Sequence, residues 1–168
     1  YDKPMIYYPL TTLMLGGVKQ FLIITSPGEV ERFQSLLYDG SQWGVEISYD
    51  IQQKPDGIAS SIIIAENFIG KDSFFLILGD NIFYGNNLIN ILLKAVNSSK
   101  GASIFGYNVL NPHRYGIVDT NKEGEPIKLT EKPKKTLSNL AITGIYYYNN
   151  KAIEYSKKLK KSSRGEYE

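Results

Sequence analysis

The run of five apolar residues from Phe74 to Leu78, which stops at Gly79 and Asp80, constrains the fold more than any other stretch. A short unbroken apolar run is typical of a strand that is buried on both faces, as in a parallel sheet. Ligands of open α/β sheets bind just beyond the carboxyl ends of such strands. Asp80 is therefore placed where a carboxylate could hold a metal ion or a substrate. The alternative is that Asp80 and Asn81 only form the turn.

Strand-like and helix-like patterns alternate through the first two thirds of the chain. The patterns predict helices at 5–15, 29–37, 57–68, 88–96 and 151–159. They predict strands at 21–25, 45–51, 74–78, 102–109, 115–118, 127–131 and 141–148. This alternation predicts an α/β fold with a Rossmann-like, doubly wound and mostly parallel (mixed) sheet, with helices on both faces. Such a domain normally begins with a strand and a phosphate-binding loop, and no strand pattern precedes the first helix.

The composition excludes several kinds of site and partner. The 168 residues suit one domain, and a net charge of +2 is too small to argue for nucleic acid or an anionic membrane. No apolar stretch approaches the ~20 residues that a membrane helix needs. With no cysteine and one histidine, His113, thiolate and histidine-rich zinc sites are excluded. Any metal must be bound by oxygen, which points to magnesium or a similarly hard cation.

The loop after the strand at 45–51 has residues that suit a flat ring. The Gln52 amide offers both a donor and an acceptor, and could pair with the edge of a base. Gly57 lets the backbone approach a ring closely. Asp56 is placed to cap the helix that follows. The alternative is an ordinary loop between a strand and a helix.

Further candidates follow the later strands. Glu131 could accept hydrogen bonds from sugar hydroxyls and Lys132 could neutralise a phosphate, or the two could form an exposed ion pair in a turn. Gly144 lies within an apolar strand, where a glycine often marks the close approach of a ligand. Tyr146 could contact that ligand, or could be a strand-forming aromatic residue. Arg164 could clamp a phosphate.

Taken in order, these segments resemble the sugar nucleotidyltransferase family, and in particular its thymidylyltransferases. The resemblance covers nearly the whole chain. It is carried by YDKPMIYYPL at 1–10, DGSQWG at 39–44, GDNIFYG at 79–85, RYG at 114–116, EKP at 131–133, TGIY at 143–146 and RGE at 164–166. The segments at 39–44 and 79–85 are together highly specific.

The resemblance implies transfer of a thymidylyl group from dTTP to glucose 1-phosphate, giving dTDP-glucose and pyrophosphate. It implies Mg²⁺ bound by Asp80, and catalysis by Asp80, Lys132 and Arg164. The implied nucleotide-binding residues are Gln52, Pro55, Gly57, Ile58 and Asp80. The implied sugar-phosphate-binding residues are Tyr115, Gly116, Glu131, Lys132, Gly144, Tyr146 and Arg164. It also implies a cytoplasmic homo-oligomer, a tetramer, that serves deoxysugar synthesis, such as that of rhamnose, without a nucleic-acid or membrane partner.

Two features depart from the family pattern. Ala59-Ser60-Ser61 replaces the usual Ala-Gln-Ala, and Tyr38 precedes Asp39 where glycine is common. The family also has a first strand, a glycine-rich loop with an arginine, and a later metal-binding aspartate. We therefore expect residues 1–168 to be a single nucleotidyltransferase domain truncated at both ends, lacking the first strand and the C-terminal part, and inactive alone.

Two alternatives stay open at this stage. One is a uridylyl- or cytidylyltransferase of the same family, because base and sugar selection depends on a few contacts in the pocket. The other is a domain that binds nucleotide sugars without turnover.

Overall fold

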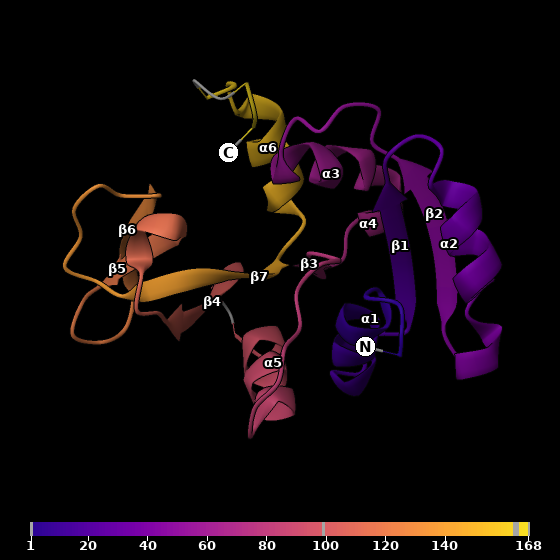
Figure 1. Ribbon diagram of the computed structural model, residues 1–168, viewed down its shortest axis with the longest axis horizontal. Coiled ribbons are helices and arrows are strands. Elements are labelled where there is room, and N and C mark those ends of the chain that lie inside the picture. The colour runs from indigo at the N-terminus through magenta and orange to yellow at the C-terminus, as the bar shows by residue number, and fades with distance from the viewer. Residues whose placement is uncertain (1, 99, 163–164, 168) are drawn as a thin grey trace.

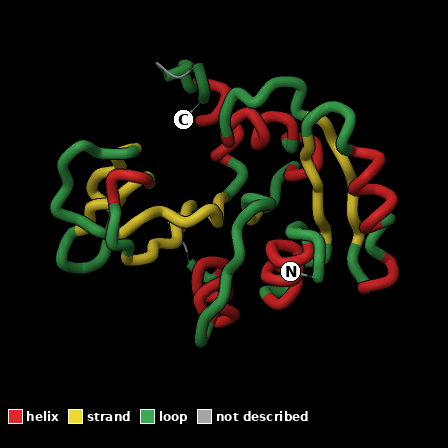
Figure 2. The backbone as a smooth tube through the Cα atoms, in the orientation of Figure 1, coloured by secondary structure: helices red, strands yellow, loops and turns green. Residues whose placement is uncertain are grey.

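The computed structural model describes residues 2–98, 100–162 and 165–167, and shows an α/β fold with two sheets (Figure 1). The predicted α/β class is confirmed. The elements are α1 (Tyr7–Leu15), β1 (Gln20–Thr25), α2 (Val30–Leu37), η1 (Ser41–Trp43), β2 (Glu46–Ile51), α3 (Ile58–Ile64), α4 (Glu66–Ile69), β3 (Phe74–Ile77), α5 (Leu88–Val96), β4 (Ala102–Asn108), η2 (Pro112–Arg114), β5 (Gly116–Thr120), β6 (Pro126–Glu131), β7 (Leu140–Tyr148) and α6 (Lys151–Lys158). Figure 2 shows how these helices and strands follow one another along the backbone.

The first sheet consists of β1 and β2, which pair in parallel. The crossover between them contains α2, which packs beside β2, while α1 lies on the β1 side of the sheet (Figure 1). Apolar residues from these elements form one core cluster, with Leu13 from α1, Phe21 from β1 and Leu37 from α2 all buried. The cluster extends to the second sheet through Ile145 of β7.

The second sheet is organised around β7. Tyr148 pairs with Phe74 of β3 on one edge and with Ala102 of β4 on the other. Towards its start, β7 pairs with β5 through Ala141 and Ile117, and β5 pairs with β6. Since β3 and β4 are both antiparallel to β7, they run parallel to each other, as strands joined by a helix usually do.

A shared cavity is bordered by β1 of the first sheet and β3 of the second. Within the described residues, β1 pairs only with β2 and β3 pairs only with β7, so each strand has a free edge. Both strands line one cavity of about 1350 Å³. The strand at 74–78 was expected to be buried on both faces, whereas β3 is half-buried among the described residues.

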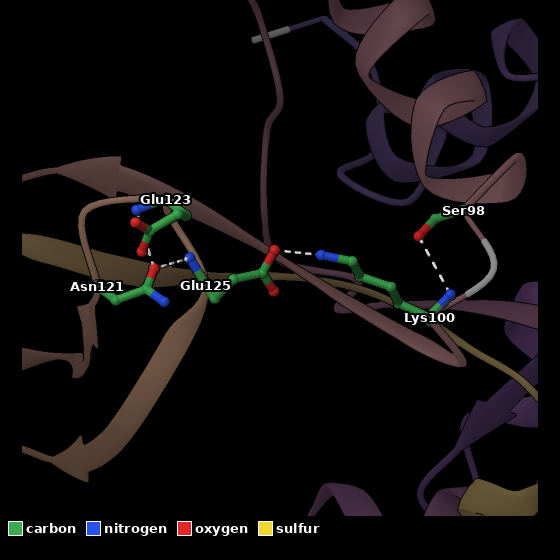
Figure 3. A network of polar contacts seen from close by, with 5 residues as sticks. All are labelled: Ser98, Lys100, Asn121, Glu123 and Glu125. Atoms are coloured by element: carbon green, nitrogen blue, oxygen red, sulfur yellow. Dashed lines mark hydrogen bonds and ion pairs between the residues drawn. The ribbon is translucent and has the colours of Figure 1, made fainter.

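Polar contacts fasten the turn of the β5–β6 hairpin to the start of β4 (Figure 3). Lys100 forms an ion pair with Glu125 in that turn. The Asn121 side-chain oxygen accepts hydrogen bonds from the backbone N–H groups of Glu123 at 3.1 Å and Glu125 at 2.8 Å. An exposed ion pair of this kind contributes at most about 1 kcal/mol. The ion pair between Lys100 and Glu125 helps to orient the hairpin.

Among the residues described, no helix has the length and apolar character needed to cross a bilayer.

Candidate functional site

Asp80 lies just beyond the carboxyl end of β3, where the sequence pattern placed it. The chain leaves the sheet after Leu78, whose N–H donates to the Gly144 carbonyl at 2.8 Å. Asp80 itself is exposed, and the adjacent Gly79 lines the large cavity between the sheets. No group of three or more histidine, cysteine, aspartate or glutamate residues that could hold a metal ion is found in the part of the chain that the structure describes.

Gly144 allows the loop after β3 to lie against β7. A Cβ atom built on Gly144 would overlap the Asn81 side-chain nitrogen, and would lie 2.9 and 3.0 Å from side-chain atoms of Leu78. The sequence suggested that this glycine marks the close approach of a ligand. In the structure, the close approach is made by the chain's own loop, which carries Asp80.

Four candidate residues meet at the open end of the β5–β6 hairpin. Gly116 pairs with Glu131, and the Lys132 N–H donates to the Tyr115 carbonyl at 3.0 Å. The Glu131 carboxylate lies over Gly116, since a Cβ there would be 3.0 Å from its Oε2. The sequence therefore identified residues that the fold brings together.

Lys132 and Glu131 form the exposed ion pair that was considered as the alternative, with 3.7 Å between Nζ and Oε1. Both side chains are about half exposed, so the pair contributes little to stability. Lys132 also has a φ of 41°, in the left-handed region that residues other than glycine rarely adopt. Such backbone geometry is concentrated at functional sites. This supports a role for Lys132 beyond the ion pair.

One cavity of about 720 Å³ is lined both by residues predicted to bind the sugar phosphate and by residues predicted to bind the nucleotide. Glu131 and Tyr146 line it together with Gly57 and Ile58, which stand at the start of α3. Residues of α6 and the segment after it also line this cavity, namely Ala152, Tyr155, Ser156 and Leu159. Gly57 and Ile58 also line the larger cavity, with Gln52 and Pro55. The two cavities therefore share the start of α3.

Tyr146 stacks on Tyr148, with ring centroids 5.9 Å apart and planes only 8° from parallel. Burial raises the pKa of the Tyr146 phenol, and the negative charge of Glu131 raises it further. Sequence reasoning missed Tyr148, although residues two apart on a strand point to the same face. Since Tyr148 also lines the smaller cavity, the aromatic surface there is larger than predicted.

Gln52 is oriented by its own loop. Its Nε2 donates to Asp56 Oδ1 at 3.3 Å and to the Gly57 carbonyl at 3.2 Å. The expectation that Asp56 caps the helix is wrong, because Gly57, with a φ of 108°, occupies the N-cap position of α3 and provides no side chain. The Asp56 side chain contacts Gln52, Lys161 and the side chain of Ser60 instead.

Some predicted site residues line neither cavity, namely Asp80, Tyr115, Gly116, Lys132 and Gly144. Arg164 falls outside the described residues, so its predicted contact with a phosphate stays a prediction.

The pH dependence of stability should report the burial of Tyr148. Burial raises the pKa of its phenol to about 12, and the neighbouring Tyr146 contributes further. Since the unfolded chain releases this proton near pH 10, the stabilisation is complete below that pH and is lost as the pH rises towards 12. In the complete protein, Tyr148→Phe should therefore lose less thermal stability between pH 10 and pH 12 than the wild type.

Melting curves followed by circular dichroism at each pH would measure this difference. Tyr107→Phe is the matched control, because Tyr107 is 69% exposed on β4 and should leave the wild-type slope unchanged. Equal slopes for Tyr148→Phe and the wild type would contradict the prediction.

The α/β frame places polar candidate residues beyond β3, at the start of α3 and at the end of a β-hairpin. The family model described as nucleotidyl transferase matches residues 1–168. The chain therefore belongs to the nucleotidyl transferase family.

Curated relatives show which members of the family it resembles. The chain is 49% identical over all 168 residues to a glucose-1-phosphate thymidylyltransferase of Neisseria meningitidis. It is 51% identical over the same length to a protein of the same name from Mycobacterium tuberculosis. In both comparisons the chain spans 58% of the relative's length.

Solved structures agree on the fold. A Bacillus anthracis protein described as a glucose-1-phosphate thymidylyltransferase, in complex with sucrose, is 35% identical with a TM-score of 0.87, over 96% of this chain and 65% of that one. A UDP-glucose pyrophosphorylase without ligand is 19% identical with a TM-score of 0.84, over 99% of this chain and 72% of that one. The second likeness shows the fold alone.

Proposed function

We propose that the complete protein carrying these residues transfers a thymidylyl group from dTTP to glucose 1-phosphate and releases pyrophosphate. The observation that carries this proposal is the 40–51% identity, over all 168 residues, to curated glucose-1-phosphate thymidylyltransferases. The chain covers 55–58% of the length of those relatives, so the proposal concerns the complete protein.

The geometry of the described residues supports a site with two adjoining halves. The Gln52 loop and Gly57 offer an amide and close backbone approach, which suit the edge and face of a base. Glu131 and Tyr146 offer a carboxylate acceptor and an aromatic face beside it, which suit a sugar with its hydroxyl groups. Because one cavity is lined by Gly57, Glu131 and Tyr146, a nucleotide and a sugar would be bound side by side.

The reaction requires the phosphate oxygen of the sugar phosphate to attack the α-phosphorus of dTTP. The new P–O bond forms as the bond to the pyrophosphate group breaks, so pyrophosphate leaves with its negative charge. No covalent intermediate with the protein is needed, and the residues act by positioning the reactants. Lys132, held in its unusual backbone conformation at the end of the hairpin, would neutralise the sugar phosphate. Arg164 would assist it.

Mg²⁺ suits the donor set that this part of the protein offers. Magnesium is commonly bound by one or two carboxylates together with substrate phosphates and water. Asp80 is exposed beyond β3 and could provide one such carboxylate. When bound, the ion would offset negative charge on the reacting phosphates. We propose Asp80 as one ligand of this ion.

We also propose that the complete protein is a cytoplasmic tetramer. Its product would enter deoxysugar synthesis, such as that of rhamnose.

The direct test is to assay the complete protein with glucose 1-phosphate and each of dTTP, UTP and CTP, measuring both pyrophosphate and the nucleotide sugar. We expect dTDP-glucose to form with the highest kcat/KM. A strong preference for UTP or CTP would reject the thymidylyl assignment in favour of the alternative within the family. Binding of nucleotide sugars without pyrophosphate release would instead identify a non-catalytic domain.

A further inference from the structure

The side chain of Gln52 has both of its N–H groups engaged within the protein. One acceptor is the Asp56 carboxylate at 3.3 Å and the other is the Gly57 carbonyl at 3.2 Å. A carboxylate and a backbone carbonyl can only accept hydrogen bonds, so the amide must turn its nitrogen towards them. Its oxygen is then the group left to meet a ligand in the cavity that Gln52 lines.

Asp56 is held in place from several directions. Lys161 Nζ lies 3.5 Å from its Oδ2, and the Tyr167 N–H donates to its backbone carbonyl at 2.7 Å. Lys161 also lies 5.0 Å from the centre of the Tyr167 ring and pairs with Tyr167 in an antiparallel bridge. The segment after α6 thus holds Asp56 through both its backbone and its side chain.

The charge on Asp56 is maintained by its neighbours. A hydrogen bond from the Ser60 side chain lowers the pKa of the Asp56 carboxyl, with further contributions from Gln52 and Lys161. Asp56 is therefore ionised near neutral pH, and an ionised carboxylate orients an amide more strongly than a neutral acceptor does. Gly57 allows the Tyr167 backbone to lie close to this loop, because a Cβ atom on residue 57 would be only 2.5 Å from the Tyr167 carbonyl oxygen.

We propose that Asp56, supported by Lys161, is a positioning residue that fixes the orientation of Gln52 and thereby selects bases with an N–H at ring position 3. This inference rests on the proposed function, in which Gln52 reads the base. The fixed amide presents an oxygen, which accepts a hydrogen bond from the N3–H of thymine or uracil. Cytosine has an unprotonated, acceptor nitrogen at that position and is disfavoured. Asp56 would then contribute to base selection without touching the base.

The test uses the complete protein with the Asp56→Asn substitution, which keeps the shape but replaces the charge with an amide that can donate. The Gly57 carbonyl is then the one acceptor left to hold the Gln52 nitrogen, so the amide turns more freely and presents its oxygen to the cavity for less of the time. With glucose 1-phosphate in excess, kcat/KM for dTTP and for UTP should both fall about tenfold, chiefly through KM, which corresponds to the loss of about one hydrogen bond. The ratio of CTP to dTTP use should rise about tenfold.

Three further variants separate positioning from a general effect on structure. Asp50→Asn is the matched control, since Asp50 is exposed on β2 and its Oδ1 accepts a hydrogen bond from the neighbouring Ile51 N–H. It should leave the base preference unchanged. Lys161→Met should shift the preference in the same direction as Asp56→Asn but less, and Lys161→Arg should restore it because it keeps the positive charge.

The outcomes distinguish this inference from the proposed function. A wild-type protein that does not prefer dTTP contradicts the proposed function. A wild type that prefers dTTP, with an Asp56→Asn variant that keeps the same CTP to dTTP ratio, overturns the positioning role. An equal loss with all three nucleotides also overturns it, because it shows structural damage only. If turnover is absent, equilibrium binding of dTTP, UTP and CTP without sugar is measured instead, and a protein that binds none overturns both proposals.

Discussion

Replacing Asp80 with asparagine in the complete protein should lower turnover by roughly two orders of magnitude while leaving the fold intact. The expected loss is large because the substitution removes a negative charge from the position proposed to hold Mg²⁺, and a catalytic metal provides several kcal/mol of charge stabilisation. The fold should survive because Asp80 is exposed beyond β3 and belongs to neither core cluster. Steady-state rates of pyrophosphate release, with melting curves of the same samples, would measure both effects.

Asp72→Asn is the matched control for this experiment. Asp72 is also exposed and lies just before β3, whereas Asp80 lies just after it. It should retain wild-type turnover, because it lines the large cavity at the opposite end of β3 from Asp80. A rate for Asp80→Asn equal to that of the wild type, over a range of magnesium concentrations, would exclude the metal-binding role.

Gly144→Ala should lower both stability and turnover. The new methyl group would overlap the Asn81 side chain and crowd Leu78, whose N–H is hydrogen-bonded to the Gly144 carbonyl. Overpacking of this kind lowers the free energy of unfolding by about 1–3 kcal/mol. Because the displaced loop carries Asp80, a shift of about 1 Å there should also lower turnover about 100-fold. Denaturant unfolding and steady-state kinetics would measure the two losses separately.

Gly85→Ala is the appropriate comparison, because Gly85 follows in the same loop and a Cβ there would meet nothing within 4 Å. Neither glycine has a positive φ, so the comparison isolates steric crowding from backbone strain. We expect Gly85→Ala to be close to wild type in both measurements. If the two alanine variants behave alike, the close approach at Gly144 does not constrain the loop.

The positions of helices and strands were predictable from the sequence because they depend on local patterns. The alternating pattern at 45–51 and the apolar run at 74–78 correspond to β2 and β3 within one residue at each end. The pairing of strands was not predictable in the same way. Nothing near residues 141–148 indicates that this strand lies between β3 and β4, because pairing depends on contacts between distant parts of the chain.

The candidate site was predicted in part for similar reasons. Glu131 and Tyr146 could be named from the sequence, but their shared cavity with Gly57 is a property of the fold. The role expected for Asp56 was wrong because capping is a local expectation, whereas Lys161 reaches Asp56 from the other end of the chain. Residues that act through such distant contacts leave no local signal.

The central position of β7 has a consequence for the order in which the protein folds. This strand pairs directly with β3, β4 and β5, so the second sheet cannot form until β7 has been synthesised. Pairings between strands so far apart in sequence have a large loop-closure entropy, which slows folding. On the ribosome, the loop that carries Asp80 therefore emerges well before the strand that fixes it. We expect the loop that carries Asp80 to become ordered only after residues 140–148 have emerged.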